Sequence, residues 1–331
     1  MRAAIVGAGG HVGSQALQQL VFENEDADLE LVLLGRTPDR IRGVVADIVS
    51  ALPLVARHLP GRRPPRITIT SDLRELRRSD VVVLTAAQWP SPEEEAHLAP
   101  SDPTGRLVQA YANASMVADL SRAAAAVCPE ALFLVVTNQS DLMADVARRK
   151  LPAERVLGFG GIVDSARLRT LLAEGFGLPA AALTAGNHIV GYHNYDLIPL
   201  ASSLTQPLDE HRLSKMTDDV RRYGEKVSRL KKGAATTGDF GANVLPGCAV
   251  HAALSALLGH GEALEESFNV CLPAEAAALY GTRSGAALSV PVRLERCGYA
   301  VVTSYAVAAS ERSFLAQAQQ TMDQTWAQFE R

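Results

Sequence analysis

The chain has 331 residues, of which 47% are hydrophobic and 21% charged, as in ordinary globular proteins, and this length favours two domains. A formal net charge of −4 at pH 7 excludes a general attraction to nucleic acid or to anionic membranes. No stretch approaches a membrane span, and the apolar run at the start is too short for a secretory signal. We therefore expect a cytoplasmic protein that binds neither nucleic acid nor membrane.

Neither the arginines nor the cysteines cluster in a way that predicts a binding site. The stretch 57–78 holds seven arginines but no aromatic residues, and it contains three prolines, so we interpret it as solvated surface. The four cysteines lie far apart, without a CxxC pair or a histidine at zinc-ligand spacing. His188 and His193 are five residues apart, which fits no standard metal pair. The sequence predicts no metal site.

The first half of the chain alternates short apolar runs with helical patterns. The run "AAIV" leads into glycines and then into a helix with apolar Leu17, Leu20 and Val21. Further apolar runs follow in "LELVLLGRT", "RITITSD", "DVVVLTAA" and "ALFLVVTN", and a long helix through 116–127 precedes the last of them. This rhythm indicates parallel strands joined by crossovers. We expect a Rossmann-type doubly wound α/β sheet in residues 1–150, with ligands at the carboxyl ends of the strands.

Glycines fill the turn after the first strand. Gly7, Gly10 and Gly13, with Gly9 also present, form a GxGGxxG pattern, which is one residue longer than GxGxxG. Glycines there let backbone N–H groups approach a pyrophosphate at the start of the next helix. An ordinary tight turn would use glycines too. The position after the first strand favours the dinucleotide site.

The end of the second apolar run bears on which dinucleotide binds. An NAD site usually has an acidic residue there for the ribose 2′-hydroxyl. This chain has Gly35 and Arg36 instead, followed by Thr37 and, close by, Arg40. A carboxylate repels a 2′-phosphate, whereas a guanidinium binds it through two parallel hydrogen bonds. The sequence favours NADP over NAD, with Arg36 and Thr37 in the cofactor site; the alternative is a solvated arginine at a strand end.

The second half mixes helices and strands without the earlier rhythm. In "GGIVDSARLRTLLAEGFGL", Asp164 and Arg167 lie three apart and share one helical face, either as a salt bridge or as a pair that orients an imidazole and binds an anion. A one-sided amphipathic helix is expected over 211–233, a β-hairpin over 287–307 and a helix from Glu311 onward. We expect an α+β substrate domain in residues 151–331.

The stretch "GYHNYD" at 191–196 places His193 between two aromatic residues. A histidine in such a place is usually a hydrogen-bonded residue of the core or its rim. Local sequence alone does not identify it as a base, so both interpretations stay open on this stretch alone.

Several motifs occur in a characteristic order: "GAGGHVG" at 7–13, "VVTN" at 135–138, "DSARLR" at 164–169 and "GYHNYDLIPL" at 191–200. The helix "GRLVQAYANASM" at 105–116 and "YGTRSGAALSVPV" near the end belong to the same series. In this order the chain resembles the lactate/malate dehydrogenase family over essentially its whole length, and its glycine turn has the malate dehydrogenase length. The resemblance implies an NAD(P)-dependent oxidoreductase that interconverts a 2-oxo acid and an L-2-hydroxy acid, and a homodimer or homotetramer.

The resemblance also implies catalytic roles. His193 would exchange a proton with the substrate oxygen, and Asp164 would bind its other ring nitrogen and fix the tautomer. Arg106 would arrive with a mobile loop, contact the substrate and polarise its carbonyl.

Three further residues would bind ligands by the same resemblance. Arg167 would hold the substrate C1 carboxylate through two hydrogen bonds. Asn138 would lie near nicotinamide and substrate, and Asn113 near the cofactor.

The family pattern breaks at three places, which leaves the substrate open. The loop 88–105 is longer than expected, has no arginine and carries Glu93, Glu94 and Glu95. Gln139 stands where the family usually has proline, which removes a backbone constraint, and the segment 234–246 is lengthened. A specialised 2-oxo acid reductase fits these departures better than an ordinary malate dehydrogenase. A malate-like substrate stays open if Arg169 or a partner subunit replaces the missing loop arginine.

Two other classes of protein remain as alternatives. NAD-dependent glycosidases share a related fold but use a Cys/His metal site, and no cysteine lies near the candidate motifs here. A non-catalytic descendant would keep the fold without turnover. The retained set of Arg106, Asp164, Arg167 and His193 favours a dehydrogenase over both.

Overall fold

The structure is a computed structural model, and it describes residues 1–26, 28–93, 96, 106–179, 183, 185–193, 196–233, 244–260 and 263–329. The chain divides into two compact units. The first unit comprises Met1–Leu157, Asn243–Glu262 and Glu295–Gly298, and the second comprises Gly158–Ala242, Ala263–Leu294 and Tyr299–Arg331.

The sheet of the first unit has the strand order β3-β2-β1-β4-β5-β6. Its strands are β1 (Arg2–Val6), β2 (Glu30–Leu34), β3 (Arg66–Thr70), β4 (Val81–Leu84), β5 (Leu132–Val135) and β6 (Val156–Gly158). The pairs β1–β2, β1–β4, β2–β3 and β4–β5 are all parallel. The prediction of a doubly wound parallel sheet is confirmed. Because the strand order reverses beside β1, its carboxyl end is the point where such sheets bind ligands.

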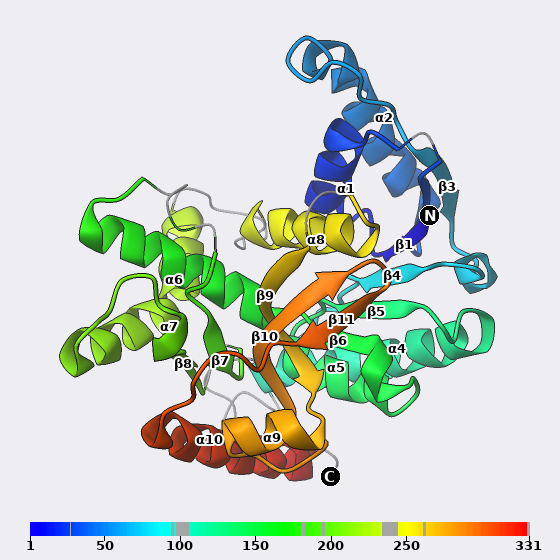
Figure 1. The fold of residues 1–331 in the computed structure, drawn as a ribbon. Helices are drawn as coiled ribbons and strands as arrows, with labels where there is room; N and C mark the ends of the chain where they lie inside the picture. The colour runs from blue at the N-terminus through cyan, green and yellow to red at the C-terminus, as the bar shows by residue number, and fades with distance from the viewer. Residues whose placement is uncertain are drawn as a thin grey trace. The chain divides into compact units, whose positions relative to one another are not determined.

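Helix α8 (Val244–Leu257) comes late in the chain but packs on α1 (His11–Glu23) in the first unit, as Figure 1 shows. A Cβ on Gly247 would lie 2.4 Å from the Cβ of Gln15, so the two helices approach closely there. The two units therefore differ from the predicted domains, which met at residue 150, because α8 belongs to the first unit. The physical reason is that α8 is largely apolar and needs cover, which the first unit provides; its fully buried residues include Val250, Ala253, Leu254 and Leu257.

Among the described residues, the first unit also contains the helices α2 (Pro38–Val55), α4 (Arg106–Val127) and α5 (Ser140–Arg148). The central strands β1 and β4 are apolar without alternation, and Ala3–Val6 and Val81–Leu84 are all buried. Such continuous apolar runs are typical of parallel strands covered on both faces.

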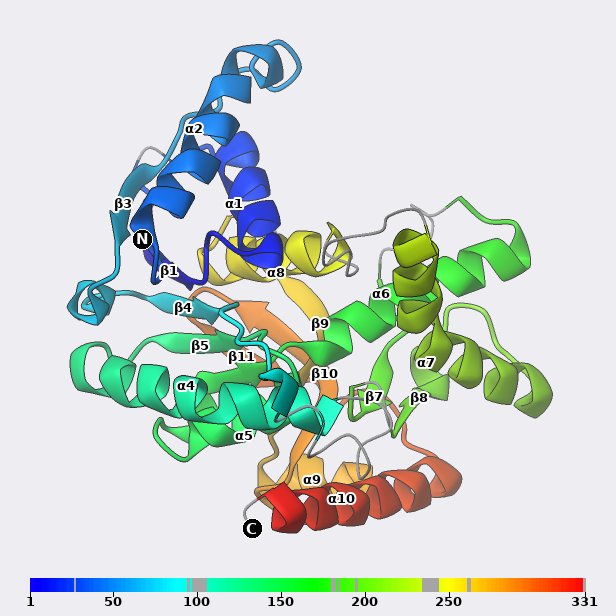
Figure 2. The ribbon, with the colours of Figure 1, turned by 180° about the vertical axis from the view of Figure 1, so that it is seen from behind.

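The second unit is built on antiparallel strands. β9 (Leu264–Cys271), β10 (Ala287–Glu295), β7 (Ile189–Gly191) and β8 (Leu197–Pro199) follow one another in that order, and β11 (Gly298–Val301) pairs with β10. Figure 2 shows its helices from behind: α6 (Gly160–Phe176), α7 (Glu210–Gly233), α9 (Ala274–Tyr280) and α10 (Ala309–Phe329). The predicted α+β mixture, the hairpin and the C-terminal helix are confirmed, the last beginning two residues before Glu311.

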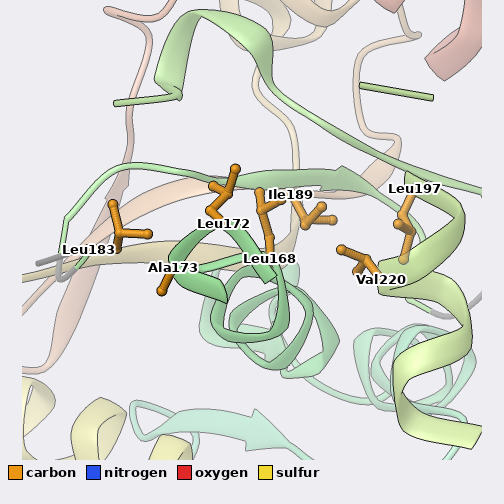
Figure 3. Packing of buried hydrophobic residues seen from close by; sticks show 7 residues of the cluster. All are labelled: Leu168, Leu172, Ala173, Leu183, Ile189, Leu197 and Val220. Carbon is orange, nitrogen blue, oxygen red and sulfur yellow. The ribbon is translucent and has the colours of Figure 1, made fainter. Parts of the chain in front are cut away.

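Buried aliphatic side chains fix α6 against the β7–β8 hairpin and α7. Figure 3 shows this cluster, which consists of Leu168, Leu172, Ala173, Leu183, Ile189, Leu197 and Val220. Leu168, Leu172, Leu197 and Val220 are fully excluded from solvent. Burying a Leu or Val side chain contributes about 1.5–3 kcal/mol, so this cluster holds the hairpin rigidly to α6. The hairpin and α6 carry the residues described next.

Candidate functional site

The glycine turn brings backbone close to backbone at the carboxyl end of β1. Gly7 has φ +94°, and a Cβ on it would lie 2.5 Å from the backbone nitrogen of Ala86. A Cβ on Gly13 would lie 2.5 Å from the carbonyl oxygen of Gly7. Side chains at these two positions are excluded, so the tight turn requires glycine at both.

Helix α1 begins directly after this turn with Gly10 at its N-cap. Gly10 has no side chain to accept hydrogen bonds from the first N–H groups of the helix, which therefore point outward without a cap. Uncapped N–H groups and the positive end of a helix dipole suit a pyrophosphate. The turn, with its glycine-only contacts, thus fits a dinucleotide cofactor.

The carboxyl end of β2 leads into two exposed arginines, whereas the nearby Asp39, in the first turn of α2, pairs with Arg42. Gly35 leads into Arg36, Thr37 and Arg40, and the last three are all exposed. A Cβ on Gly35 would lie 3.0 Å from Cδ1 of Ile41, so a larger residue there would press on the core. Neither Arg36 nor Arg40 makes an ion pair with any residue that the structure describes. Both guanidinium groups are available to an anion.

Asn113 holds the ends of β4 and β5 together. It is 2% exposed, its Oδ1 accepts from the Gln88 backbone nitrogen at 2.7 Å, and its Nδ2 donates to the carbonyls of Gln109 and Asn138 at 2.8 and 3.1 Å. The side-chain amide is therefore committed to the backbone. Asn138 itself is exposed just beyond β5, and its peptide bond to Gln139 is cis.

In the second unit, Asp164 joins His193 to Arg167. Its Oδ2 lies 2.6 Å from Nδ1 of His193, and its Oδ1 accepts a hydrogen bond from Nη1 of Arg167 at 3.0 Å. The carboxylate is 1% exposed, and a buried carboxylate needs such partners because an unpaired buried charge is very costly. The sequence left open whether Asp164 forms a salt bridge with Arg167 or orients an imidazole. The structure contains both contacts of Asp164.

This contact defines the state of the imidazole. An ionised carboxylate only accepts hydrogen bonds, so opposite an ionised Asp164 the Nδ1 of His193 carries a proton and donates a hydrogen bond to Oδ2. Nε2 is then the ring nitrogen that takes up or releases a proton. A histidine held in this way can act as a general base or, once protonated, as a general acid.

A tight hairpin positions His193 between β7 and β8. The Tyr192 nitrogen donates to the Asp196 carbonyl at 2.8 Å. Gly191 has φ +117°, and a Cβ on it would lie 2.1 Å from that same carbonyl oxygen, so the turn requires glycine. Gly191 was not among the candidate residues predicted from the sequence. A glycine two residues before a candidate base was the available signal, but its role depends on a backbone angle.

Arg169 is fully engaged elsewhere. Its Nη1 and Nη2 bind the two carboxylate oxygens of Glu266 at 2.5 and 2.7 Å, and its Nε and Nη2 bind the Gly186 carbonyl at 3.1 and 3.0 Å. Burial raises the pKa of the Glu266 carboxyl, and the Arg169 guanidinium opposes that rise. Each of the three guanidinium nitrogens of Arg169 therefore donates to Glu266 or to the Gly186 carbonyl, which holds this side chain within the second unit.

His188 lies near the start of β7 and has a different environment from His193. It is 0% exposed, and its ring nitrogens make no hydrogen bond within the described residues. Nε2 lies 3.5 Å from Oε1 of Glu265, and the ring meets Tyr305 edge to face at 5.4 Å between centroids. Burial, together with the nearby Arg169, lowers the pKa of His188 to about 4, although Glu265 opposes this shift. His188 is therefore neutral at pH 7.

Because His188 is buried and neutral, we expect the folded protein to lose stability in acid. Below its ordinary pKa of 6.5 the unfolded chain protonates His188, whereas the folded protein does so only near pH 4. The contribution of His188 to the free energy of unfolding is fully present above pH 6.5. It is lost as the pH falls from 6.5 to 4, and the free energy of unfolding drops by on the order of 3 kcal/mol. Urea unfolding across this range measures the loss. His188→Phe, which keeps the ring but does not titrate, is expected to flatten the slope.

The exposed His211 on α7 gives the matched control. His211→Gln is expected to leave the slope of stability against pH as in the parent protein. If His188→Phe also leaves it unchanged, His188 does not control the acid sensitivity.

Parts of the predicted site lie outside the described residues. The side chain of Arg106 is one of them, although the backbone of this residue begins α4. Most of the acidic loop 88–105 and most of the segment 234–246 also lie outside the described residues. Glu93, at the start of that loop, is exposed, and so is Trp89, whose side chain is 64% exposed beyond the carboxyl end of β4.

Three other features are absent from the described residues: a metal centre, a membrane-spanning helix and a disulfide. No three or more His, Cys, Asp and Glu side chains gather there as metal ligands. The helices that the structure describes are too short or too polar to cross a membrane. The four cysteines are unpaired, and burial raises the pKa of the Cys128 thiol to about 11.

Comparison with known proteins places the first unit in a defined group. Residues 1–158 match the NAD binding domain of the lactate/malate dehydrogenases. The L-lactate dehydrogenase of Synechococcus sp. is 30% identical over 248 residues, which cover 71% of this chain and 73% of that protein. The L-2-hydroxycarboxylate dehydrogenase (NAD(P)(+)) of Methanocaldococcus jannaschii is 29% identical over 249 residues, with 71% and 73% of the two chains covered.

A solved structure agrees with this assignment at the level of the fold. The malate dehydrogenase of Salinibacter ruber superposes with a TM-score of 0.79, covering 100% of this chain and 98% of that one at 19% sequence identity. At this low identity the likeness concerns the fold.

Proposed function

The chain belongs to the lactate/malate dehydrogenase family, whose members are NAD-dependent 2-hydroxy acid dehydrogenases, and we propose on this premise that it interconverts a 2-oxo acid and its L-2-hydroxy acid with His193 as the acid–base residue. The observation that carries the proposal is the 2.6 Å contact between Nδ1 of His193 and Oδ2 of Asp164. A bound nicotinamide dinucleotide supplies the hydride for reduction and accepts it in oxidation.

His193 balances the protons of this reaction. In oxidation, Nε2 accepts the proton of the substrate hydroxyl as the carbinol carbon loses its hydride; in reduction, Nε2 returns a proton to the carbonyl oxygen. Asp164 stabilises the imidazolium between these events because its buried carboxylate faces Nδ1. It also prevents the ring from turning over.

Arg167 is proposed to bind the substrate C1 carboxylate. Only its Nη1 is used by Asp164, and the guanidinium has further donors in a planar fork that matches a carboxylate. We further propose the carbonyl contact for Arg106 and ligand contacts for Asn138. Asn113 acts through the backbone of residues 88 and 138 that it holds.

We propose that Gly7, Gly10 and Gly13 bind the pyrophosphate and that Arg36 and Thr37, with Arg40 nearby, bind a 2′-phosphate, so that NADP is preferred over NAD. The exposed, unpaired guanidinium groups at the end of β2 support this preference. The name of the Methanocaldococcus jannaschii relative includes both cofactors, so a related protein uses either.

The cofactor preference is tested by Arg36→Asp. The new carboxylate is expected to repel the 2′-phosphate and to accept a hydrogen bond from the ribose hydroxyl, lowering the kcat/KM ratio for NADPH over NADH by about tenfold to a hundredfold. Steady-state kinetics with both cofactors measures the ratio. Arg42→Asp is the matched control, since Arg42 is an exposed arginine of α2 that pairs with Asp39. An unchanged ratio in Arg36→Asp would contradict the role of Arg36.

The substrate is proposed to be a 2-oxo acid other than oxaloacetate. A dicarboxylate needs a second cation, the loop 88–105 has no arginine, and Arg169 is engaged by Glu266. The exposed Glu93 adds negative charge at the start of the loop. A partner subunit remains as a source of the second cation, because we propose that the protein is a homodimer or homotetramer. We also propose that it is located in the cytoplasm.

The first experiment is oxidation of NADPH and NADH by the purified protein with a panel of 2-oxo acids. Oxaloacetate, pyruvate, branched and aromatic 2-oxo acids and a phosphonate analogue form the panel. We expect turnover of an acid other than oxaloacetate. Strong turnover of oxaloacetate would mean that another arginine binds the distal carboxylate. Absence of turnover with every acid, although NADPH binds, would contradict the proposed substrate class.

A further inference from the structure

Helix α6 begins with a buried glycine directly under the imidazole of His193. A Cβ built on Gly160 would lie 2.2 Å from Cβ of His193, 2.4 Å from Cγ and 3.0 Å from Nδ1. Non-bonded carbon atoms pack at about 3.5–4.0 Å. The imidazole therefore fills the space that any other residue at position 160 would need for its own side chain.

We propose that Gly160 is a positioning residue: by lacking a side chain it lets His193 sit close enough to α6 to reach Asp164. This inference rests on the proposed function of His193. Gly160 and Asp164 are four residues apart and so lie on one face of the helix, one turn from each other. The ring rests over the first turn, and the carboxylate meets it from the second turn at 2.6 Å.

A side chain at position 160 would move His193 rather than merely rotate it. The clashing atoms are Cβ and Cγ, which lie next to the backbone, and not the mobile end of a long side chain. His193 cannot withdraw freely, because its hairpin is held by the Tyr192–Asp196 hydrogen bond and by buried Ile189 and Leu197. Displacement of the ring is therefore expected to act on the contact between His193 and Asp164, because this contact depends on the position of Nδ1.

Two other glycines of α6 show that this property belongs to Gly160. A Cβ on Gly161 would lie 2.6 Å from the Ser267 carbonyl oxygen, so Gly161 serves the packing of α6 on β9. A Cβ on Gly175 would meet nothing within 4 Å. Gly175 thus offers a matched substitution in the same helix, without steric conflict.

The test compares Gly160→Ala with Gly175→Ala. Alanine favours a helix over glycine, so Gly175→Ala is expected to keep or raise Tm and to keep kcat. Gly160→Ala is expected to lower kcat by about a hundredfold, the usual effect of misplacing a catalytic group by about 1 Å. Cofactor affinity, measured by NADH fluorescence, is expected to stay unchanged in both variants.

A spectroscopic readout separates positioning from general damage. The Nδ1 proton shared with Asp164 is expected to give a strongly deshielded proton NMR signal, which is assigned by its loss in His193→Gln. Gly160→Ala is expected to lose this signal and Gly175→Ala to keep it. If Gly160→Ala keeps both the signal and kcat, the inference is overturned.

A double-mutant cycle tests the contact without any activity. In His193→Gly the clashing atoms are absent, so adding Gly160→Ala to that variant is expected to leave Tm unchanged, although Gly160→Ala alone lowers it. An equal loss of Tm in both backgrounds would contradict the contact. If instead His193→Gln turns over substrate like the parent protein, the proposed function fails, while the cycle and the NMR signal still report on Gly160.

Discussion

His193→Asn is expected to lower kcat by at least about 10²- to 10⁴-fold, the usual contribution of a positioned general acid or base. The amide of asparagine can still accept or donate hydrogen bonds near Asp164, but it does not exchange a proton near neutral pH. The buried carboxylate, 1% exposed, keeps Arg167 as a partner, so the fold is expected to survive. Pre-steady-state and steady-state oxidation of NADPH measure the effect.

The control for His193→Asn is the same substitution at the exposed His211 of α7. It is expected to leave kcat, KM and cofactor affinity unchanged. Cofactor affinity of His193→Asn itself is also expected to match the parent protein, because the proposed cofactor residues are other side chains. Turnover of His193→Asn comparable with that of the parent protein would remove His193 from the acid–base role.

Arg167→Lys is expected to lower kcat/KM for the 2-oxo acid by about 10²- to 10³-fold, mainly through a higher KM. Lysine keeps the positive charge near Asp164 but lacks the planar fork that binds a carboxylate through two parallel hydrogen bonds. Truncating one partner of a buried charged pair costs about 2–5 kcal/mol, which corresponds to a loss of this size. Initial rates over a range of substrate concentrations measure it.

Arg169, two positions further along the same helix, provides the contrast. Because it binds Glu266 and Gly186 inside the second unit, Arg169→Lys is expected to lower Tm and to leave the substrate KM unchanged. If Arg169→Lys raises KM as much as Arg167→Lys does, Arg169 takes part in substrate binding, and a malate-like substrate is again favoured.

Local patterns were sufficient for much of the fold. Continuous apolar runs predicted the parallel strands, because strands covered on both faces need apolar residues at every position. The glycines after the first strand predicted a tight turn, and Gly7 and Gly13 leave no room there for a side chain beside Ala86 and Gly7. The domain division was less accurate, since α8 joins the first unit from far along the chain, and periodicity does not say which surface covers an apolar helix.

For the candidate site, residue types could be predicted but not their contacts. Asp164 and Arg167 share a helical face by spacing alone, whereas His193 lies 29 residues from Asp164. Motif order suggested the pairing, and the tertiary structure supplies its 2.6 Å geometry. Arg169 shows the opposite case: the sequence left it open as a substrate ligand, but Glu266, 97 residues away, engages it.

The sequence by itself determined the class of fold, the glycine turn and the arginine that follows β2, because each depends on residues that are close together in the chain. The candidate acid–base residue followed from the order of motifs along the whole chain. Only the tertiary structure decided that Asp164 contacts both His193 and Arg167, that Arg169 binds Glu266, and that Gly160 leaves room for an imidazole. It also decided that His188 is buried and makes no ring hydrogen bond to the part of the chain that the structure describes. These depend on how α6, the β7–β8 hairpin and β9 pack together. Packing joins residues that are distant in sequence, and no local pattern records which of them meet.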